Sequence, residues 1–272
     1  MVDTSLGCFY TVLAAHYDAI FPAGDRQLSF LGGLLGGAGC GPFLDVACGT
    51  GSYVLAVAQT HRRAVGIDLS TAMITRAHSR LKSLEVTHPR LRAEFAVGDM
   101  RRLAGLPDGE FAAAVCIGNS LPHLLNAEDV DACLSELARV LRPGGPLVIQ
   151  TVNYDCLDLR EPGCRHQLPE IRRQEPPLVF RREYRLRPDG LLDFAVRLRL
   201  DDEVRSDGPL EMSSTTQLRP WRRAQLVSRL AAVGLTEAVA YGGFDLRPHD
   251  DQAPALVLVA RRATRSSGPT CV

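Results

Sequence analysis

The sequence has little lysine, no long apolar run and no excess of either charge. Its 272 residues hold 31 basic and 31 acidic side chains, and Lys82 is the one lysine among the bases. A net charge of zero argues against a protein that binds nucleic acid through a basic face or docks on anionic lipid. We interpret the excess of arginine over lysine as genomic base composition.

Long apolar runs and an export signal are also missing. The longest apolar runs, at residues 111–117 and 253–260, are far shorter than the ~20 residues that a membrane span needs. The start of the chain lacks the segments of a secretory signal peptide. The eight cysteines include no Cys-x-x-Cys pair and no zinc-ligand spacing. We therefore expect a cytoplasmic protein with reduced thiols, no metal and no membrane partner.

Short apolar runs alternate with longer segments of helical period in the first half of the chain. Ser70 and Asn126 each precede apolar residues at helical spacing and are expected N-caps. Such alternation predicts βαβ units, and hence an α/β fold with a mainly parallel sheet. The expected strands lie at residues 42–48, 64–69, 93–98, 111–118 and 146–153.

The alternation stops after Asn153. Residues 155–177, rich in Pro, Gly, Arg and Glu, look like a loop. The next two runs alternate between apolar and polar residues around an Arg-Pro-Asp-Gly turn, which predicts an antiparallel hairpin. A further strand, a helix that ends at Gly234 and two final strands complete the chain. These later strands are expected at residues 178–186, 191–200, 211–218, 238–244 and 255–261.

This pattern divides the chain into an interrupted sheet domain and three additions. The N-terminal stretch is an expected helical cap that folds over the carboxyl edge of the sheet. The second half of the sheet domain follows an antiparallel insertion that closes over the substrate. The expected bounds are 1–40 for the cap, 41–153 and 217–262 for the sheet domain, 154–216 for the insertion and 263–272 for a disordered tail.

The residues Asp45-Val46-Ala47-Cys48-Gly49-Thr50-Gly51 lead from a strand through a glycine turn into a helix. Glycines let backbone N–H groups approach a ligand, and the helix N-terminus favours negative charge. Asp68 ends the second strand, where a carboxylate accepts both hydroxyls of a ribose. Val54 replaces the third glycine of the dinucleotide fingerprint, and Asp45 would repel a pyrophosphate. A nucleoside with a cationic amino-acid end, S-adenosylmethionine (SAM), fits better.

With Asp99 after the third strand, these residues resemble the class I SAM-dependent methyltransferases over roughly residues 40 to 153. The resemblance implies a Rossmann-like, seven-stranded, mostly parallel sheet with helices on both faces, plus an antiparallel β insertion after the fifth strand. It implies that the turn holds the methionine moiety, Asp68 the ribose and Asp99 the adenine. The cofactor-binding residues expected are Asp45, Ala47, Cys48, Gly49, Gly51, Asp68, Leu69, Met73, Asp99, Met100, Ile117, Asn119, His123, Tyr17 and Arg26.

Two further segments resemble the glycine N-methyltransferase group: Gly118-Asn119-Ser120, with His123 after it, and Asn153-Tyr154-Asp155. In that group the Asn faces the amine substrate and the His lies near the cofactor. This makes Asn119 and His123 catalytic candidates. The structural alternatives are that Asn119 caps a turn and that His123 is a packed, partly buried histidine.

The sequence departs from that group at one position. In that group an arginine at this position binds the substrate carboxylate, whereas this sequence has Val152. A valine cannot replace a bidentate arginine. We therefore expect a less polar amine, or another small nucleophile, in place of glycine.

Tyr17 is the third catalytic candidate, because an aromatic face attracts a sulfonium; packing of the N-terminal helix is the alternative. Arg26 either reaches the cofactor carboxylate or is a surface arginine. The predicted activity is methyl transfer from SAM to a small-molecule acceptor, an amine nitrogen, by in-line positioning with help from Tyr184 of the insertion.

Two other classes of function stay open at this point. One is an NAD-dependent oxidoreductase, and the other is a SAM-binding protein without catalytic activity. We expect a small-molecule substrate and no nucleic acid. Pairing of two copies of the chain through the hairpin is left open.

Overall fold

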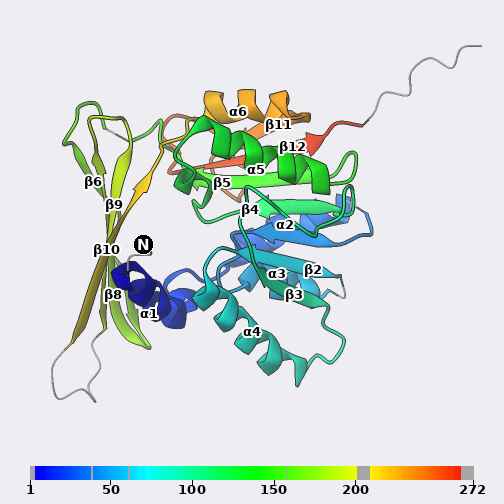
Figure 1. The fold of residues 1–272 in the computed structure, drawn as a ribbon, viewed down its shortest axis with the longest axis horizontal. Coiled ribbons are helices and arrows are strands. Elements are labelled where there is room, and N and C mark those ends of the chain that lie inside the picture. Colours follow the sequence, from blue (N-terminus) through cyan, green and yellow to red (C-terminus); the bar gives the residue numbers. More distant parts are fainter. Residues whose placement is uncertain (1–3, 38, 61, 158, 201–208, 265–272) are drawn as a thin grey trace, which may run out of the picture.

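The computed structural model describes residues 4–37, 39–60, 62–157, 159–200 and 209–264. The chain forms a helix-flanked sheet, at the right of Figure 1, and a separate antiparallel sheet at the left. The last eight residues of the expected tail, 265–272, lie outside the described residues.

The larger sheet has seven strands in the order β11-β12-β5-β4-β1-β2-β3. Strands β1 to β5 pair in parallel, whereas β12 runs antiparallel to both of its neighbours. This confirms the predicted α/β fold with a mostly parallel sheet. The strands are β1 Phe43–Val46, β2 Ala64–Asp68, β3 Ala93–Val97, β4 Ala113–Cys116, β5 Pro146–Val152, β11 Leu235–Tyr241 and β12 Ala255–Arg262.

Helices cover both faces of this sheet, as predicted. One face packs against α2, α3 and α4, and the other against α5 and α6. Ser70 and Asn126 are N-caps, since the Met73 N–H donates to the Ser70 hydroxyl and the Asp129 N–H to the Asn126 side chain. The helices are α1 Thr4–Ile20, α2 Asp25–Gly37, α3 Ser52–Ala58, α4 Thr71–Glu85, α5 Ala127–Val140 and α6 Arg223–Ala232, with a 3-10 helix η1 Leu121–His123.

The second sheet has five antiparallel strands, with β8 and β9 at its centre. It confirms the predicted antiparallel insertion after β5. The expected loop at 155–177 is wrong in its second half, where β6 and β7 pair with β8. These edge strands are short and charged and therefore show no hydrophobic period. The strands are β6 Arg165–Gln167, β7 Ile171–Gln174, β8 Pro177–Leu186, β9 Leu192–Leu200 and β10 Leu210–Leu218.

One later strand also differs from its prediction. β11 begins at Leu235 instead of residue 238 and ends at Tyr241 instead of residue 244. Leu235 is fully buried and opens the strand directly after Gly234, whereas Gly242 and Gly243 lie in the bend that follows the strand.

The N-terminal helices occupy two different places. α1 lies between the antiparallel sheet and the larger sheet (Figure 1), and its Leu13 and Ile20 pack in one cluster with Phe180 and Leu198. α2 packs with α3 on a face of the larger sheet. α1 thus joins the two sheets, whereas α2 packs on a face of the larger sheet.

Candidate active site

The glycine turn follows β1, where the strand order of the larger sheet reverses. Ligands of open α/β sheets bind at such a point. Gly49, with φ 55°, and Gly51, with φ 80°, have a left-handed backbone that glycine adopts without strain. A Cβ at Gly51 would lie 2.4 Å from the Phe95 ring, so packing beneath the turn also requires this glycine.

Asp68 at the end of β2 supports the turn. The Gly49 N–H donates to Asp68 Oδ2 at 2.8 Å, and the Ser70 N–H donates to Asp68 Oδ1 at 2.8 Å. Burial raises the pKa of Asp68, and these two donors act against that rise. Each carboxylate oxygen retains a lone pair. The carboxylate is fixed beside Gly49 and can accept two further hydroxyl donors.

Asp45 is a buried acid next to Asp68. Only 1% of it is exposed, and its Oδ2 has no hydrogen-bond partner among the residues that the structure describes. Burial raises the pKa of Asp45 well above the usual range, and the charge of Asp68 adds to this effect. A cation beside Oδ2 would offset the cost of burying the charge. The corner formed by Gly49, Asp45 and Asp68, here called the acidic corner, therefore fits the ammonium and ribose of SAM.

Asp18 on α1 holds the glycine turn, and the sequence analysis missed it. Its Oδ1 accepts hydrogen bonds from Thr50 Oγ1 at 2.6 Å, Ser52 Oγ at 3.1 Å and Arg80 Nη1 at 2.7 Å. Arg80 on α4 also donates to the Thr50 carbonyl at 2.9 Å. These partners lie 32 to 62 residues away in sequence, so no local pattern identifies the network.

Tyr17 packs over the same turn. A Cβ at Gly49 would lie 3.3 Å from the Tyr17 ring. Burial raises the pKa of the Tyr17 phenol, as do the charges of Asp68 and Asp45. The structure thus brings Tyr17 together with the acidic corner, and the phenol is neutral there.

Asp99 follows β3 and is engaged by Arg101. Arg101 Nη2 donates to Asp99 Oδ2 at 2.6 Å, and Arg101 Nε donates to Asp99 Oδ1 at 3.1 Å. These bonds lower the pKa of Asp99. An adenine amino group that bound the Asp99 carboxylate would therefore share this carboxylate with the Arg101 guanidinium. Met100, next in sequence, packs against the core cluster of α5.

Four other predicted cofactor residues lie in or beside the core. Cys48 and Ile117 are buried in one cluster, and Met73 is buried against α1. Ala47 has a left-handed backbone, with φ 60°, directly before Cys48. Burial raises the pKa of the Cys48 thiol, which therefore stays protonated.

Two predicted cofactor residues are largely exposed. Leu69 is 72% exposed, next to Asp68. The Arg26 side chain is 79% exposed and lies 3.8 Å from Asp245. The structure places Arg26 in this surface pair and does not join it to the glycine turn.

Asn119 follows β4 with a left-handed backbone, φ 62°. Its Oδ1 accepts hydrogen bonds from the Val152 N–H at 2.9 Å and the Tyr154 hydroxyl at 3.1 Å. Its Nδ2 donates to the hydroxyl of Tyr184, on β8 of the second sheet, at 3.4 Å. Burial raises the pKa of Tyr184 to about 12. Asn119, Tyr154 and Tyr184, here called the asparagine–tyrosine cluster, join the two sheets.

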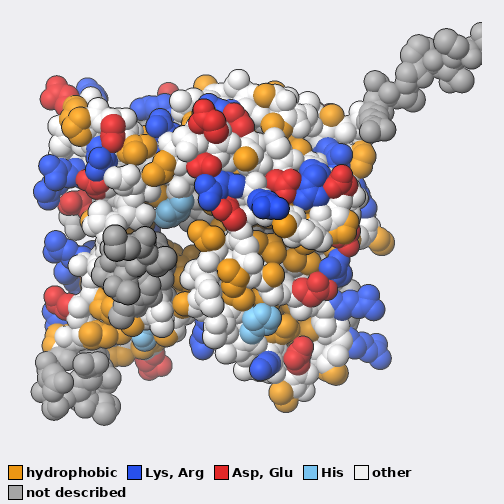
Figure 2. Space-filling model, in the orientation of Figure 1, with side chains coloured by type: hydrophobic (Ala, Val, Ile, Leu, Met, Phe, Trp, Pro, Cys, Tyr) orange, Lys and Arg blue, Asp and Glu red, His pale blue; other side chains and the backbone are white. Residues whose placement is uncertain are grey.

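His123 lies at the end of η1, on an open cavity of about 440 Å³ that Asp193 and Thr216 of the insertion also line. The residue is exposed at this cavity, and the protein atoms around the imidazole lower its pKa by reducing its solvation. It is therefore neutral near pH 7 and able to accept a proton. Figure 2 shows that the surface is hollowed where the two sheets face each other.

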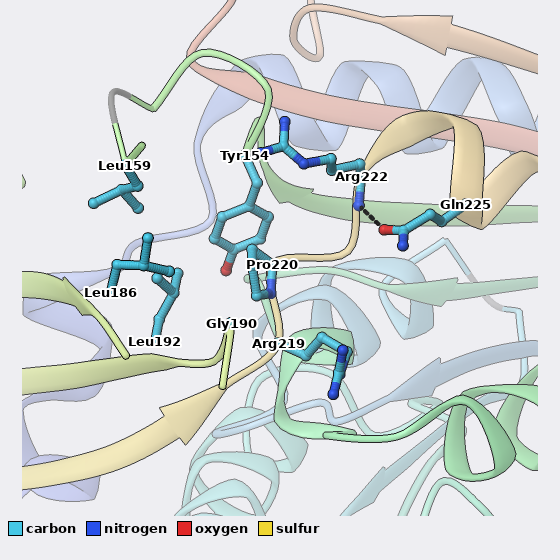
Figure 3. A pocket seen from close by; sticks show the side chains of 9 residues that line it. All are labelled: Tyr154, Leu159, Leu186, Gly190, Leu192, Arg219, Pro220, Arg222 and Gln225. Carbon is cyan, nitrogen blue, oxygen red and sulfur yellow. Dashed lines mark hydrogen bonds between the residues drawn. The ribbon is translucent and has the colours of Figure 1, made fainter. Parts of the chain in front are cut away.

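A second cavity, of about 310 Å³, lies beside Tyr154 (Figure 3). Leu186 and Leu192 contribute to its apolar wall. Arg222 at its edge pairs with Asp155 at 2.7 Å. No residue of the glycine turn lines this cavity, which meets the asparagine–tyrosine cluster only through Tyr154.

Comparison with known proteins identifies the central part of the chain. A family model described as a methyltransferase domain matches residues 43–145. Residues 43–145 are a methyltransferase domain. The match covers the glycine turn, Asp68, Asp99 and Asn119, and it confirms the predicted class I SAM-dependent methyltransferase family with SAM as its cofactor.

The methyltransferase domain has relatives of named activity. The glycine/sarcosine N-methyltransferase of Aphanothece halophytica is 24% identical over 226 residues, which are 80% of this chain and 75% of that protein. The dTDP-3-amino-3,4,6-trideoxy-alpha-D-glucopyranose N,N-dimethyltransferase of Streptomyces venezuelae is 33% identical over 109 residues, 39% of this chain. The chain thus spans only 40% of the Streptomyces enzyme.

A solved structure supports the fold over most of the chain. The crystal structure of a SAM-dependent methyltransferase from Clostridium acetobutylicum ATCC 824 matches with a TM-score of 0.75 and 14% identity. The match covers 94% of this chain and 100% of that chain. The similarity therefore extends beyond the methyltransferase domain to the cap and the insertion.

Two further observations concern the described residues alone. No group of three or more His, Cys, Asp and Glu side chains among them could hold a metal ion. None of their helices has both the length and the apolar character needed to cross a membrane.

Proposed function

We propose that this protein transfers a methyl group from SAM to the nitrogen of a small-molecule amine. The observation that carries the proposal is that α1 brings Tyr17 onto the acidic corner while the second sheet brings Tyr184 to Asn119. The two similar proteins described above are named for methylation of glycine, sarcosine and an amino sugar, which favours nitrogen as the acceptor atom.

The acidic corner would hold the cofactor. Asp45 would bind the ammonium of the amino-acid end, and Asp68 would accept the two ribose hydroxyls. When bound, SAM supplies a methyl group that its positive sulfonium activates. The Tyr17 ring beside Gly49 offers an aromatic face to that charge.

The chain's own residues would orient the acceptor. The oxygen of the Asn119 amide already accepts two hydrogen bonds, so Asn119 is a positioning residue for Tyr154 and Tyr184. The phenol oxygens accept the N–H donors of an amine and so direct its lone pair. After transfer, the methylated ammonium sheds a proton, and neutral His123 would accept it.

Calorimetric titration with SAM, its product S-adenosylhomocysteine (SAH) and NADH tests this proposal. We expect micromolar binding of SAM and SAH. Asp68→Ala removes two hydrogen bonds to a charged acceptor and should weaken binding about 100-fold. Asp189→Ala, in an exposed turn of the insertion, is the matched control and should bind SAM normally.

Methyl transfer is then measured with a panel of small amines and alcohols. Methylation of amines supports the proposal, and methylation of alcohols alone would move the acceptor to oxygen. Binding of NADH without response to SAM contradicts it, and SAM binding without transfer to any acceptor indicates a non-catalytic role.

A further inference from the structure

Alternate residues of β8 face opposite sides of the second sheet. Phe180 and Tyr184 are 2% and 1% exposed, and they pack in clusters with α1 and with Tyr154. Arg182 lies between them in sequence and therefore shares their face. Its neighbour Arg181 points to the other side, where it pairs with Glu170.

Arg182 stands between the two halves of the site. Its guanidinium carbon lies 5.7 Å from the centre of the Phe21 ring and 5.9 Å from that of Phe180. Phe21 in turn packs against Tyr17, with ring centres 5.2 Å apart. On the other side of Arg182, two residues along β8, lies Tyr184. A chain of contacts thus runs from the glycine turn through Arg182 to Asn119.

The donors of Arg182 are incompletely used. Its Nη2 donates to the Pro169 carbonyl at 3.1 Å. Its Nε is buried and has no hydrogen-bond partner within the part of the chain that the structure describes. No acidic side chain of these described residues forms an ion pair with it. An anionic group beside this guanidinium would supply the partner that the buried Nε lacks.

Two other arginines of this half of the chain have hydrogen-bond partners. Arg173 on β7 donates to the carbonyls of Ala19 and Ile20 at the end of α1, at 2.6 Å and 3.3 Å. Arg222 pairs with Asp155. Arg173 and Arg222 thus have structural partners, whereas the Nε of Arg182 lacks one.

We propose that Arg182 binds an anionic group of the acceptor, so that the substrate is an amine that also carries a carboxylate or a phosphate. This inference rests on the proposed methyl transfer. Val152 stands where the glycine N-methyltransferase group has its carboxylate-binding arginine. Val152 alone predicts a less polar acceptor, but Arg182 on β8 would supply a cation from the insertion instead. Because this cation comes from a different element, the acceptor would differ in shape from glycine.

The test uses matched pairs of amines that differ in charge: glycine and glycinamide, 4-aminobutyrate and 4-aminobutyramide, and 2-aminoethyl phosphate and ethanolamine. Binding to the SAH-loaded protein is measured by calorimetry, and kcat/KM is measured for every methylated amine. The third pair separates phosphate from carboxylate recognition. The variants are Arg182→Gln and Arg182→Lys, with Arg181→Gln as the control on the opposite face of the same strand.

We expect at least one acid to bind about 10- to 100-fold better than its neutral partner, since a charge-assisted bidentate pair is lost in the latter. Arg182→Gln should abolish this ratio, Arg182→Lys should restore part of it, and Arg181→Gln should leave it unchanged. A general folding defect would weaken both members of a pair equally and so would leave the ratio intact.

Three results would overturn the inference: no acid binds the SAH-loaded protein at millimolar concentration, neutral amines bind as well as acids, or the preference survives in Arg182→Gln. Each of these can occur with normal SAH binding, in which case the proposed methyl transfer is unaffected. Failure to bind SAM or SAH would instead remove the proposed function.

Discussion

Single side chains set the electrostatics of the acidic corner. Asp45 is buried, and its Oδ2 has no hydrogen-bond partner among the described residues. Asp68 is already held by two backbone N–H groups. The two acids therefore differ in what they require, although both follow strands of one sheet. We expect their substitutions to have different consequences.

The pH dependence of stability should report the burial of Asp45. Burial raises its folded pKa above the unfolded value near 4. Its contribution to stability is therefore full below about pH 4 and is lost as the pH rises through the folded pKa. Asp45→Asn mimics the protonated form and should gain stability over the ligand-free wild type as the pH rises, by about 1.4 kcal/mol per pH unit between the two pKa values.

Thermal unfolding of both proteins from pH 4 to pH 8 measures this difference. Saturating SAM should reverse it, because the ammonium of SAM stabilises the charged carboxylate and not the amide. A melting-temperature difference that is constant with pH would contradict the burial of a charged Asp45.

The backbone of Asn119 allows its side chain to be tested apart from its conformation. A left-handed backbone at φ 62° destabilises alanine by about 1–2 kcal/mol, whereas glycine adopts it without this steric cost. Both Asn119→Gly and Asn119→Ala remove the contacts to Val152, Tyr154 and Tyr184. We expect both variants to bind SAM normally and to lose most methyl transfer, with Asn119→Ala less stable to urea. Unchanged turnover in the glycine variant would remove Asn119 from the mechanism.

At the scale of elements, α1 decides whether the glycine turn is covered. Asp18 joins it to Thr50, Ser52 and Arg80, and Arg173 on β7 donates to its last carbonyls. The helix is therefore tied to both the larger sheet and the insertion. Its sequence shows a helical stretch and gives no sign of this double attachment.

Asp18→Ala should loosen α1 and weaken SAM binding. It leaves partly buried Arg80 without its carboxylate, and we expect a loss of about 1–3 kcal/mol in the free energy of unfolding. Hydrogen exchange should accelerate at residues 11–20 more than in β1. Thr50→Val, which removes a single donor to Asp18, is the control and should have a smaller effect. Equal exchange in Asp18→Ala and wild type would show that apolar packing alone holds α1.

At the scale of the whole molecule, the two sheets meet through two apolar clusters. One contains Leu13 of α1 with Phe180 of β8, and the other contains Tyr154 with Tyr184 and Leu218. The site proposed above would lie between these clusters. A ligand there would contact both sheets, so that its binding would also stabilise their contact with each other.

SAH at 100 times its Kd should stabilise the protein by about 2.7 kcal/mol, which raises the melting temperature by several degrees. Hydrogen exchange should slow together in α1, in residues 49–52 and in β8. Asp68→Ala at the same SAH concentration is the control: with a Kd about 100-fold higher it should gain only about 0.4 kcal/mol and show much weaker protection. Protection confined to the larger sheet would place the insertion outside the site.

The sequence alone determined the parallel sheet, the glycine turn and its acids, because hydrophobic period and turn chemistry are local properties. Ser70 and Asn126 could be recognised as caps for the same reason. Only the tertiary structure decided the partners of Asp18, the joining of Asn119 to Tyr184, the pairing of β6 and β7 with β8, and the place of Arg182. These contacts connect residues far apart in sequence, and the folded sheets bring them together through packing that no local pattern records.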